Sequence, residues 1–271
     1  MGKRKEKKLQ TSYQIISREK TIMAKKILVV GGTSGLGLKL AELYLAEGSH
    51  VGIVGRRENL LHEIKQQFPV NLEILKADIS EDNIQDELIN LINRMGGMDV
   101  FILTASIGEF NEELSLEKEL KTVDINVKGY TSALNTAWHY FNQKGNGHIV
   151  AVTSIAAARG NKAAPAYNAS KAFQSNYIEG LRVKSKHEKN KIAITELIPG
   201  YIDTAMGKGD RMFWVATSDK AARQSKKAID KKRTRAFITK RWWLIYCTLR
   251  FLPIFIYDSF INASWKMKHK N

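Results

Sequence analysis

Several features that define common protein classes are scarce in this sequence of 271 residues. A single cysteine, Cys247, allows no disulfide within the chain, and a reducing cytosolic setting fits best. The six histidines are scattered without the spacing of metal ligands, so no metal site is expected. The first 22 residues lack the apolar segment of a secretory signal. With 44% hydrophobic residues, the chain can bury one substantial core.

Acidic residues are also few, 27 against 43 Lys and Arg, which gives a net charge of +16. The excess lies at the two ends, because residues 1–26 carry +7 and residues 220–271 carry +12, whereas residues 27–219 carry −3. Basic ends beside a near-neutral centre indicate an anionic surface, phospholipid or nucleic acid, as a partner. The charges form tails and not a basic stripe with interleaved aromatic residues, so nucleic acid is not expected.

Short apolar runs alternate with amphipathic stretches through the centre of the chain. The runs predict strands at residues 27–30, 50–55, 72–78, 98–105, 147–154 and 191–200. The stretches between them predict helices near residues 35–47, 58–67, 83–95, 115–143 and 165–189. Apolar strands between helices are typical of a parallel sheet covered on both faces. The sequence therefore predicts a doubly wound, three-layer α/β fold of the Rossmann type in a single domain.

A glycine-rich turn, GGTSGLG at residues 31–37, directly follows the first predicted strand. Gly31, Gly35 and Gly37 would allow a tight turn, a close approach by a pyrophosphate, and its delivery to the N-terminus of the next helix. The same glycines could serve a tight turn alone. Their place between a strand and a helix, at the start of a βαβ unit, favours dinucleotide binding.

The second predicted strand ends in Gly55-Arg56-Arg57, without the acid that usually holds the ribose hydroxyls of NAD. Two guanidinium groups at this point could bind a 2′-phosphate, since each offers a planar fork of donors. The alternative is that these arginines only cap a solvated helix. The missing acid and the added cations together favour NADP(H) over NAD(H).

The stretch YNASK places Tyr167 and Lys171 four residues apart in a predicted helix, and therefore on one face of it. A cation beside the phenol favours the phenolate, so the tyrosine pKa could fall from about 10 toward the range where general acids and bases work best. A Tyr-x-x-x-Lys pair also occurs on solvated helices that have no catalytic role. The spacing alone leaves both interpretations open.

The ordered set of motifs resembles the classical short-chain dehydrogenase/reductase family, from residue 24 to about residue 206. The matching motifs are the glycine turn, ADIS with Asp78, DINVKG with Asn126, VTSIAA with Ser154, YNASK, and PGYIDTAM at residues 199–206. Ser154 lies 13 residues before Tyr167, which is the usual spacing in the family. One motif departs, because Leu103-Thr104-Ala105-Ser106 stands where the family typically has Asn-Asn-Ala-Gly. The departure concerns the loop beside the nicotinamide ribose and alters none of the acid–base residues.

The resemblance implies an NAD(P)-dependent enzyme in which Tyr167 protonates the substrate oxygen as hydride arrives from the nicotinamide. Lys171 would hold the ribose hydroxyls, and Ser154 would hydrogen-bond the carbonyl oxygen. Asn126 would order a water behind Lys171, or would be only a polar kink in a long helix. The residues expected at the cofactor are Gly31, Thr33, Ser34, Gly35, Leu36, Gly37, Arg56, Arg57, Asp78, Ile79, Ala105, Tyr167, Lys171, Pro199, Gly200, Ile202 and Thr204.

Two further segments follow this core. Residues 207–235 are polar and basic and are expected to cover a substrate pocket. Residues 241–260 are mostly apolar, but Arg250 and Pro253 divide them into runs too short for the roughly 20 residues of a membrane span. This segment either packs on the domain or a partner subunit, or lies in a membrane interface with Trp242 and Trp243 at headgroup depth. The arrangement is similar to that of family members that reduce lipid ketones, including 3-ketosphinganine reductases.

The sequence thus predicts a basic disordered arm at residues 1–22, a Rossmann catalytic domain at residues 23–206, and a substrate-covering, basic and apolar extension at residues 207–271. We expect an NADPH-dependent ketone reductase of the cytoplasm, with a lipid or other hydrophobic ketone, a peripheral membrane location and a homo-oligomer as open options. The alternatives are an NAD-linked alcohol dehydrogenase and a non-catalytic Rossmann scaffold tethered to an anionic membrane. The presence of Ser154, Tyr167 and Lys171 disfavours the scaffold.

Overall fold

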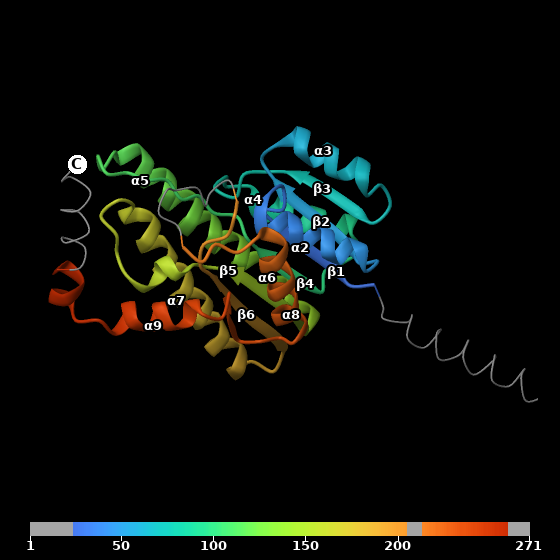
Figure 1. Cartoon of the computed structure of the whole chain (residues 1–271). Coiled ribbons are helices and arrows are strands. Elements are labelled where there is room, and N and C mark those ends of the chain that lie inside the picture. The colour runs from blue at the N-terminus through green and yellow to red at the C-terminus, as the bar shows by residue number, and fades with distance from the viewer. Residues whose placement is uncertain (1–23, 205–212, 260–271) are drawn as a thin grey trace, which may run out of the picture.

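A computed structural model describes residues 24–204 and 213–259 (Figure 1). The predicted arm at residues 1–22, Met206 of the PGYIDTAM motif, residues 207–212 and the end of the chain after residue 259 lie outside the described residues.

Seven strands form one parallel sheet in the order β3-β2-β1-β4-β5-β6-β7. They are β1 (Lys26–Val30), β2 (His50–Gly55), β3 (Leu72–Lys76), β4 (Val100–Leu103), β5 (Asn146–Val152), β6 (Lys191–Pro199) and β7 (Arg235–Ile238). The strand order reverses between β1 and β4, and in open α/β sheets ligands bind outside the carboxyl ends of the strands at such a point. The predicted doubly wound fold is confirmed.

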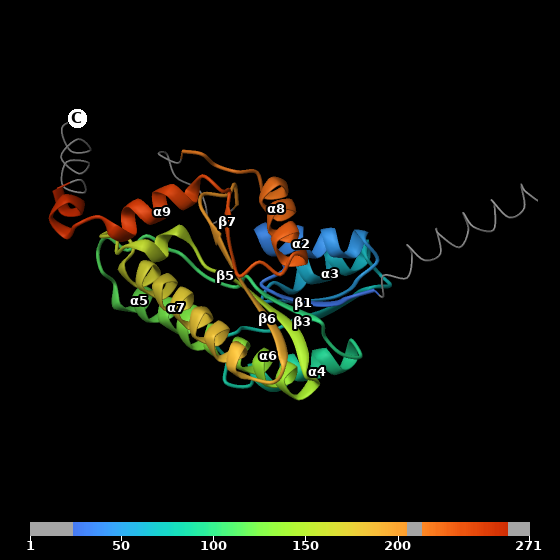
Figure 2. The ribbon, with the colours of Figure 1, turned by 90° about the horizontal axis from the view of Figure 1, so that it is seen from below.

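Helices cover both faces of the sheet and complete the three layers (Figure 2). On one face lie α2 (Gly35–Ala46), α3 (Glu58–Gln67) and α8 (Ser218–Asp230), and on the other lie α4 (Ile84–Arg94), α5 (Leu116–Val123), α6 (Tyr130–Lys144) and α7 (Pro165–His187). Side chains of a strand point alternately to the two faces, so Ile27 and Val29 join the core under α2, whereas Leu28 and Val30 join the core under α4 and α6. Burial on both faces explains why the strands are apolar without alternation.

The long helix predicted near residues 115–143 is divided by a π-helical turn, η1 (Asp124–Gly129), between α5 and α6. Asn126 lies in this turn with none of its surface exposed (0%). A Cβ on Gly129 would lie 2.6 Å from the Ile79 carbonyl oxygen, so the turn packs directly on the segment after β3. Single π turns within helices frequently mark functional positions.

Helix α8 and strand β7 were not predicted. Helix α8 lies within residues 207–235, which were expected to cover the pocket, and β7 begins at the last of them. Helix α8 buries Ala221, Ala222 and Ala228 against α2 and the sheet, and a stripe of alanines gives a weak apolar signal. Strand β7 pairs with β6 from Glu196–Arg235 to Pro199–Ile238. The described part of residues 207–235 therefore supplies one helix of a layer and the first residue of the edge strand.

The chain then forms α9 (Trp242–Phe251), whose inner side packs on the domain. Trp242 is 1% exposed and fills the space beside Gly200, where a Cβ would lie 2.1 Å from the indole ring. The outer side leaves Trp243 and Leu244 exposed. Within the described ranges, no helix combines the length and the apolar character needed to cross a membrane.

Candidate active site

One cavity of about 1100 Å³ lies along the carboxyl ends of the strands. The predicted site residues that line it are Gly31, Thr33, Ser34, Gly35, Leu36, Gly37, Arg56, Arg57, Asp78, Ile79, Ala105, Ser154, Tyr167, Lys171, Pro199, Gly200, Ile202 and Thr204. Asn126 is buried and is not among the residues that line the cavity. Residues far apart in the sequence thus meet at one surface because parallel strands end at the same edge.

The glycine loop between β1 and α2 is packed too tightly for side chains. Gly31 has a φ of +91° and Gly35 a φ of +56°, which glycine adopts readily. A Cβ on Gly31 would lie 2.5 Å from the backbone nitrogen of Ala105, and one on Gly37 would lie 2.4 Å from the carbonyl oxygen of Gly31. The N-terminus of α2 has unsatisfied N–H groups that favour an anion. This cradle fits the pyrophosphate of a dinucleotide.

The two arginines after β2 lie at the edge of this loop. Arg57 donates to the hydroxyls of Thr33 (3.0 Å) and Ser34 (2.7 Å), so these contacts do not neutralise its charge. Arg56 forms an ion pair with Asp78 at 3.2 Å, and both of these side chains are partly open to solvent. Burial acts to raise the pKa of Asp78, but hydrogen bonds from Ser80 and the charge of Arg56 lower it overall. The Asp78 carboxylate is therefore ionised at neutral pH.

Ser154 and Tyr167 are brought together by a short 3-10 helix (Ile155–Ala158) and by α7. The Ser154 Oγ accepts from the Ala156 N–H at 3.1 Å, so Ser154 caps the 3-10 helix. The side chain of Asn168, the residue after Tyr167, donates to the carbonyls of Ala156 (3.1 Å) and Arg159 (2.7 Å). These bonds fix the start of α7 against the turn that carries Ser154.

The electrostatic environment of Tyr167 differs from the prediction. Burial raises the pKa of Tyr167, and a hydrogen bond with Ser154 lowers it only in part. Lys171 lies with its Nζ 5.7 Å from the centre of the Tyr167 ring and is 3% exposed. Burial lowers the pKa of Lys171 to about 7. The expected lowering of the tyrosine pKa by a neighbouring ammonium is thus outweighed, because the same burial that shields the phenol also disfavours the cation.

Asn126 lies behind Tyr167 and Lys171, and both the oxygen and the NH₂ group of its side chain are hydrogen-bonded. Its Oδ1 accepts from the Ile107 N–H (2.9 Å) and the Ser106 hydroxyl (3.0 Å), and its Nδ2 donates to the Ile107 carbonyl (2.8 Å) and the Ser170 hydroxyl (3.0 Å). The link between Asn126 and Lys171 runs through Gln174. The Gln174 Nε2 donates to the Asn126 carbonyl at 2.9 Å, and its Oε1 accepts from the Lys171 Nζ at 2.9 Å.

The motif that departs from the family pattern also supports the site. Thr104 donates its hydroxyl toward the carbonyls of Val30 (3.1 Å) and Gly31 (3.0 Å), which ties β4 to the glycine loop. Ser106 binds Asn126, as described above. No role was predicted from the sequence for Thr104, Ser106 or Gln174. Each is a polar residue at a position that the hydrophobic pattern places in the interior, and this was the signal that could have revealed a role.

The C-terminal segment forms another part of the cavity wall, through Leu249 and Tyr257. Arg159 holds it in place, since its guanidinium donates to the carbonyl of Leu249 at 2.7 Å and to that of Leu252, and lies 5.4 Å from the centre of the Tyr257 ring. The Tyr257 hydroxyl donates to the Gly160 carbonyl at 2.5 Å. Sequence reasoning missed Arg159, whose partners are almost one hundred residues away.

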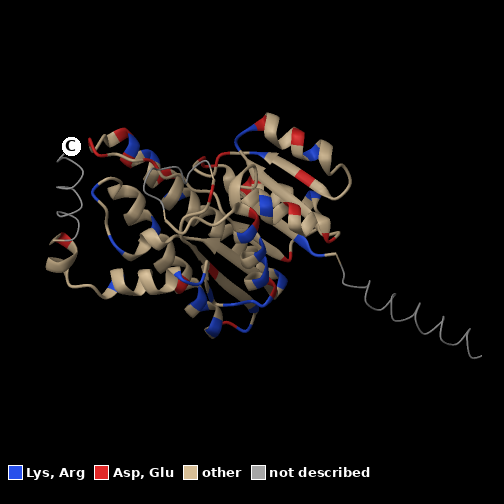
Figure 3. Cartoon of the chain, in the orientation of Figure 1, with Lys and Arg blue, Asp and Glu red and all other residues tan. Residues whose placement is uncertain are grey.

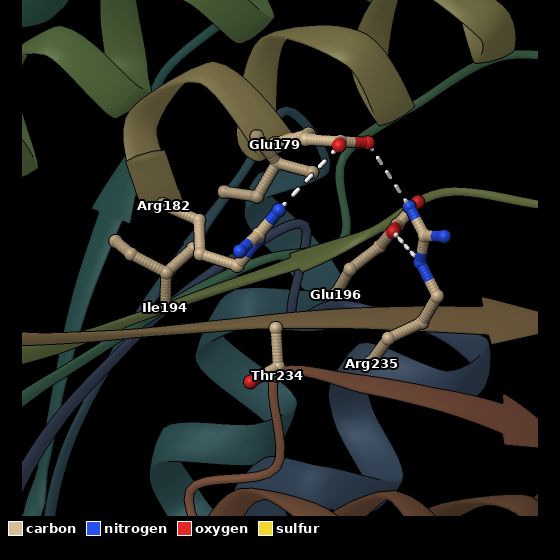
Figure 4. Close-up of a pocket in the computed structure, with 7 residues that line it drawn as sticks. Glu179, Arg182, Ile194, Glu196, Thr234 and Arg235 are labelled. Carbon is tan, nitrogen blue, oxygen red and sulfur yellow. Dashed lines mark hydrogen bonds and ion pairs between the residues drawn. The ribbon is translucent and has the colours of Figure 1, made fainter. Parts of the chain in front are cut away.

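A smaller cavity of about 130 Å³ between α7, β6 and β7 carries a network of charges (Figure 4). Buried Glu196 accepts from the Thr153 hydroxyl (2.9 Å), the Ser175 hydroxyl (2.7 Å) and Arg235 (2.6 Å). Glu179 pairs with both Arg235 (3.5 Å) and Arg182 (3.4 Å). Because these four charges already pair with one another, the network joins elements behind Ser154 and offers no evident ligand site. Among the described residues, no group of three or more His, Cys, Asp or Glu could hold a metal.

Comparison with known proteins agrees with this arrangement. A sequence profile described as short chain dehydrogenase matches residues 25–213, more than half of the chain. The chain therefore belongs to the short-chain dehydrogenase family and is an NAD(P)-dependent oxidoreductase.

Two relatives carry general names. An uncharacterized oxidoreductase of Mycobacterium tuberculosis is 28% identical over 232 residues, which are 82% of this chain and 90% of the relative. An uncharacterized oxidoreductase of Myxococcus xanthus is 31% identical over 189 residues, 66% of this chain and 72% of the relative. The structure of a short-chain dehydrogenase from Streptomyces avermitilis has a TM-score of 0.75 at 20% identity and covers 93% of this chain and 100% of its own. That likeness shows the fold.

Proposed function

We propose that this protein is an NADPH-dependent reductase of hydrophobic ketones. The observation that carries the proposal is the meeting of the glycine cradle, two arginines, and Ser154, Tyr167 and Lys171 at one cavity. The glycine loop and the N-terminus of α2 would hold the pyrophosphate. Arg56 and Arg57 would bind the 2′-phosphate, and Ile202 and Thr204 would lie at the nicotinamide end.

In this proposal Tyr167 gives its proton to the substrate oxygen, and the raised pKa keeps that proton on the phenol at neutral pH. Bound NADPH supplies the hydride. Ser154 hydrogen-bonds the carbonyl oxygen as negative charge develops on it. Lys171 binds the ribose hydroxyls and, when protonated, stabilises the tyrosinate that forms. Asn126 and Gln174 hold Lys171 from behind.

NADP(H) is favoured over NAD(H) because the hydroxyl partners of Arg57 leave its charge beside the cradle, and Arg56 stands where an acid would hold NAD. Losing one arginine–phosphate contact costs about 1.5 to 3 kcal/mol, more than tenfold in affinity. We expect Arg56→Ala to weaken NADPH binding by that factor and to leave NADH binding nearly unchanged. Fluorescence titration of both nucleotides measures this.

Arg94→Ala is the matched control, since Arg94 is a partly exposed arginine that bonds the Ile74 carbonyl on another part of the domain. It should bind NADPH as the wild type does. A wild type that binds NADH more tightly than NADPH would favour the alternative, an NAD-linked alcohol dehydrogenase.

The ketone is inferred to be hydrophobic because Phe110, Ile155, Leu249 and Tyr257 contribute to the cavity wall. A panel of aryl, alkyl and long-chain ketones, followed by NADPH oxidation, tests this directly. Binding of NADPH with no turnover of any ketone, or of the matching alcohols with NADP⁺, would favour the non-catalytic scaffold.

A peripheral membrane location is a second proposal, carried by the outer side of the C-terminal segment. Phe251 is 81% exposed, and Ile254 and Phe255 are each 68% exposed. Seven Lys and Arg and no acid occur between residues 231 and 257, which suits anionic headgroups. The segment that lines the cavity with Leu249 and Tyr257 would then also touch the lipid, so a ketone could enter from the bilayer surface.

A further inference from the structure

Gln174 lies three residues after Lys171 on α7, and its side chain is wholly buried (0% exposed). A buried amide needs partners for both its oxygen and its NH₂ group. The Nε2 donates to the carbonyl oxygen of Asn126 at 2.9 Å, and the Oε1 accepts from the Lys171 Nζ at 2.9 Å. The amide therefore joins the π turn of η1 to the lysine of α7.

The partners of this amide also fix which way it faces. A carbonyl oxygen can only accept, so it must meet the NH₂ group, and the amide oxygen is then turned toward an ammonium, which can only donate. Asn126 is itself held by four side-chain hydrogen bonds, and the Gln174 backbone carbonyl accepts from the buried Tyr130 hydroxyl at 3.1 Å. The amide oxygen offered to Lys171 is thus oriented from η1, whereas α6 bonds only the backbone of Gln174.

Among the described residues, no carboxylate is a cause of the shifted Lys171 pKa. Burial is the single cause that shifts its pKa, to about 7, so no acid among the described residues contributes. Tyr167 and Tyr130 contact the cluster, and burial raises the pKa of each, so both are neutral near pH 7. A neutral amide stabilises the ammonium less than a carboxylate would. The Gln174 amide also accepts only one of the three N–H donors of the Lys171 ammonium and leaves two for other partners.

We propose that Gln174 is a positioning residue for Lys171, whose amide, oriented by the Asn126 carbonyl, holds the lysine against the rear of the site and directs its remaining donors to the cavity. The inference rests on the proposed function in one respect, since the remaining N–H donors of Lys171 would bind the ribose of the cofactor. The link between the two side chains can be tested without any cofactor.

The test is a titration of Lys171 by NMR in protein labelled with ¹³C at the lysine ε carbons, with Lys171→Met identifying the signal. In Gln174→Glu the acceptor position gains a negative charge, which should raise the lysine pKa by one unit or more, since an adjacent opposite charge typically shifts a pKa by about 1 to 3 units. In Gln174→Met, of similar length but without the acceptor, the pKa should fall. The same two variants should bind NADPH at least about threefold differently from each other at pH 8, where fewer than half of the wild-type lysines would be charged.

Tyr130→Phe is the control, because it removes a buried hydrogen bond to the Gln174 backbone and leaves the amide in place. It should lower the melting temperature without moving the Lys171 titration. Lys171 titrating at the wild-type pH in both Gln174→Glu and Gln174→Met would overturn the proposal. Shifted titrations together with a wild type that fails to bind NADPH would instead leave the positioning role standing and remove the proposed function.

Discussion

At the scale of single residues, Tyr167 is kept protonated by its surroundings. Its ring packs against Gly108, where a Cβ would lie 2.9 Å from the ring, and burial raises the pKa of the phenol. A phenol that holds its proton at neutral pH suits donation to a substrate oxygen.

Tyr167→Phe should reduce ketone turnover by at least about 10² to 10⁴, the usual contribution of general acid catalysis, because only the proton donor is removed. The ring and its packing remain, so the NADPH dissociation constant should change little. Steady-state rates and nucleotide titration on the same sample measure the two effects. Retention of half the wild-type rate would refute the assignment of Tyr167 as proton donor.

The lowered pKa of Lys171 predicts a pH dependence of stability. This pKa is about 7 in the folded protein, against an ordinary value of 10.5. Between these two pH values the unfolded chain binds a proton that the folded protein does not, so stability rises with pH across this window. Relative to Lys171→Met, the wild type should gain up to about 1.4 kcal/mol of unfolding free energy per pH unit above pH 7. Below pH 7 the full cost of burying the charge remains.

Denaturant unfolding of both proteins at pH 6.5, 8 and 9.5 measures this difference. Burial raises the pKa of the buried tyrosines Tyr130 and Tyr167, and both are common to the two proteins. Parallel stability curves for wild type and Lys171→Met would show that Lys171 keeps an ordinary pKa.

At the scale of elements, Arg159 from the turn after Ser154 bonds the end of the C-terminal helix. Arg159 donates to carbonyls at the end of α9, where unsatisfied carbonyl oxygens and the helix dipole favour a cation. The same guanidinium lies beside the Tyr257 ring. Arg159 therefore connects the turn after Ser154 to two residues of the cavity wall, Leu249 and Tyr257.

Arg159→Met should loosen the segment after β7 while leaving the Rossmann layers intact. We expect faster proteolysis between residues 241 and 259 and a several-fold higher KM for the best ketone. NADPH binding should be unchanged, because the guanidinium bonds Leu249 and Leu252 and not the glycine loop. Arg250→Met, a change on the same helix, is the matched control. Equal protease sensitivity in wild type and Arg159→Met would show that the contacts of Arg159 do not hold the segment.

At the scale of the whole molecule, apolar and charged surfaces are separated. Residues 242–257 contain one charged residue, Arg250, whereas α8 and the turn that follows it carry many Lys and Arg (Figure 3). Helix α9 lies at the end of the molecule away from α3 (Figure 1, Figure 2). Exposed aromatic and aliphatic side chains with basic residues nearby are typical of an interfacial membrane segment.

Replacing Phe251, Ile254 and Phe255 together by serine should abolish co-flotation with anionic vesicles and leave the melting temperature close to that of the wild type, because all three side chains are mostly exposed. Added salt should also weaken wild-type binding by screening the basic residues. Flotation with phosphatidylserine-containing vesicles at low and high salt measures both effects.

Leu116→Ser provides the control, since Leu116 on α5 is similarly exposed but lies on another element. It should float as the wild type does. Wild type that stays with the soluble fraction even at low salt would remove the membrane proposal and with it the reason for favouring a lipid ketone.

The sequence by itself determined the fold class and the glycine loop, and it predicted Ser154, Tyr167 and Lys171 as the acid–base residues, which the structure places along one cavity. Strand and helix periodicities are local, and the predicted strand at residues 50–55 and helix near 58–67 agree with the structure because neighbouring residues alone decide which face is apolar. Helix α8 and strand β7 were not predicted, because alanines and a four-residue strand give a weak hydrophobic pattern. The π turn at Asn126 was not predicted either, because the sequence around it continues the pattern of one long helix.

Only the tertiary structure decided the environment of those residues. The pKa of Lys171 depends on how deeply it is buried, and its partner Gln174 depends on the Asn126 carbonyl, which comes from a different helix. Arg159 can donate to the carbonyls of Leu249 and Leu252 only because α9 packs beside the site. Burial and long-range hydrogen bonds arise from packing between elements far apart in the chain, and a local pattern contains no information about those distances.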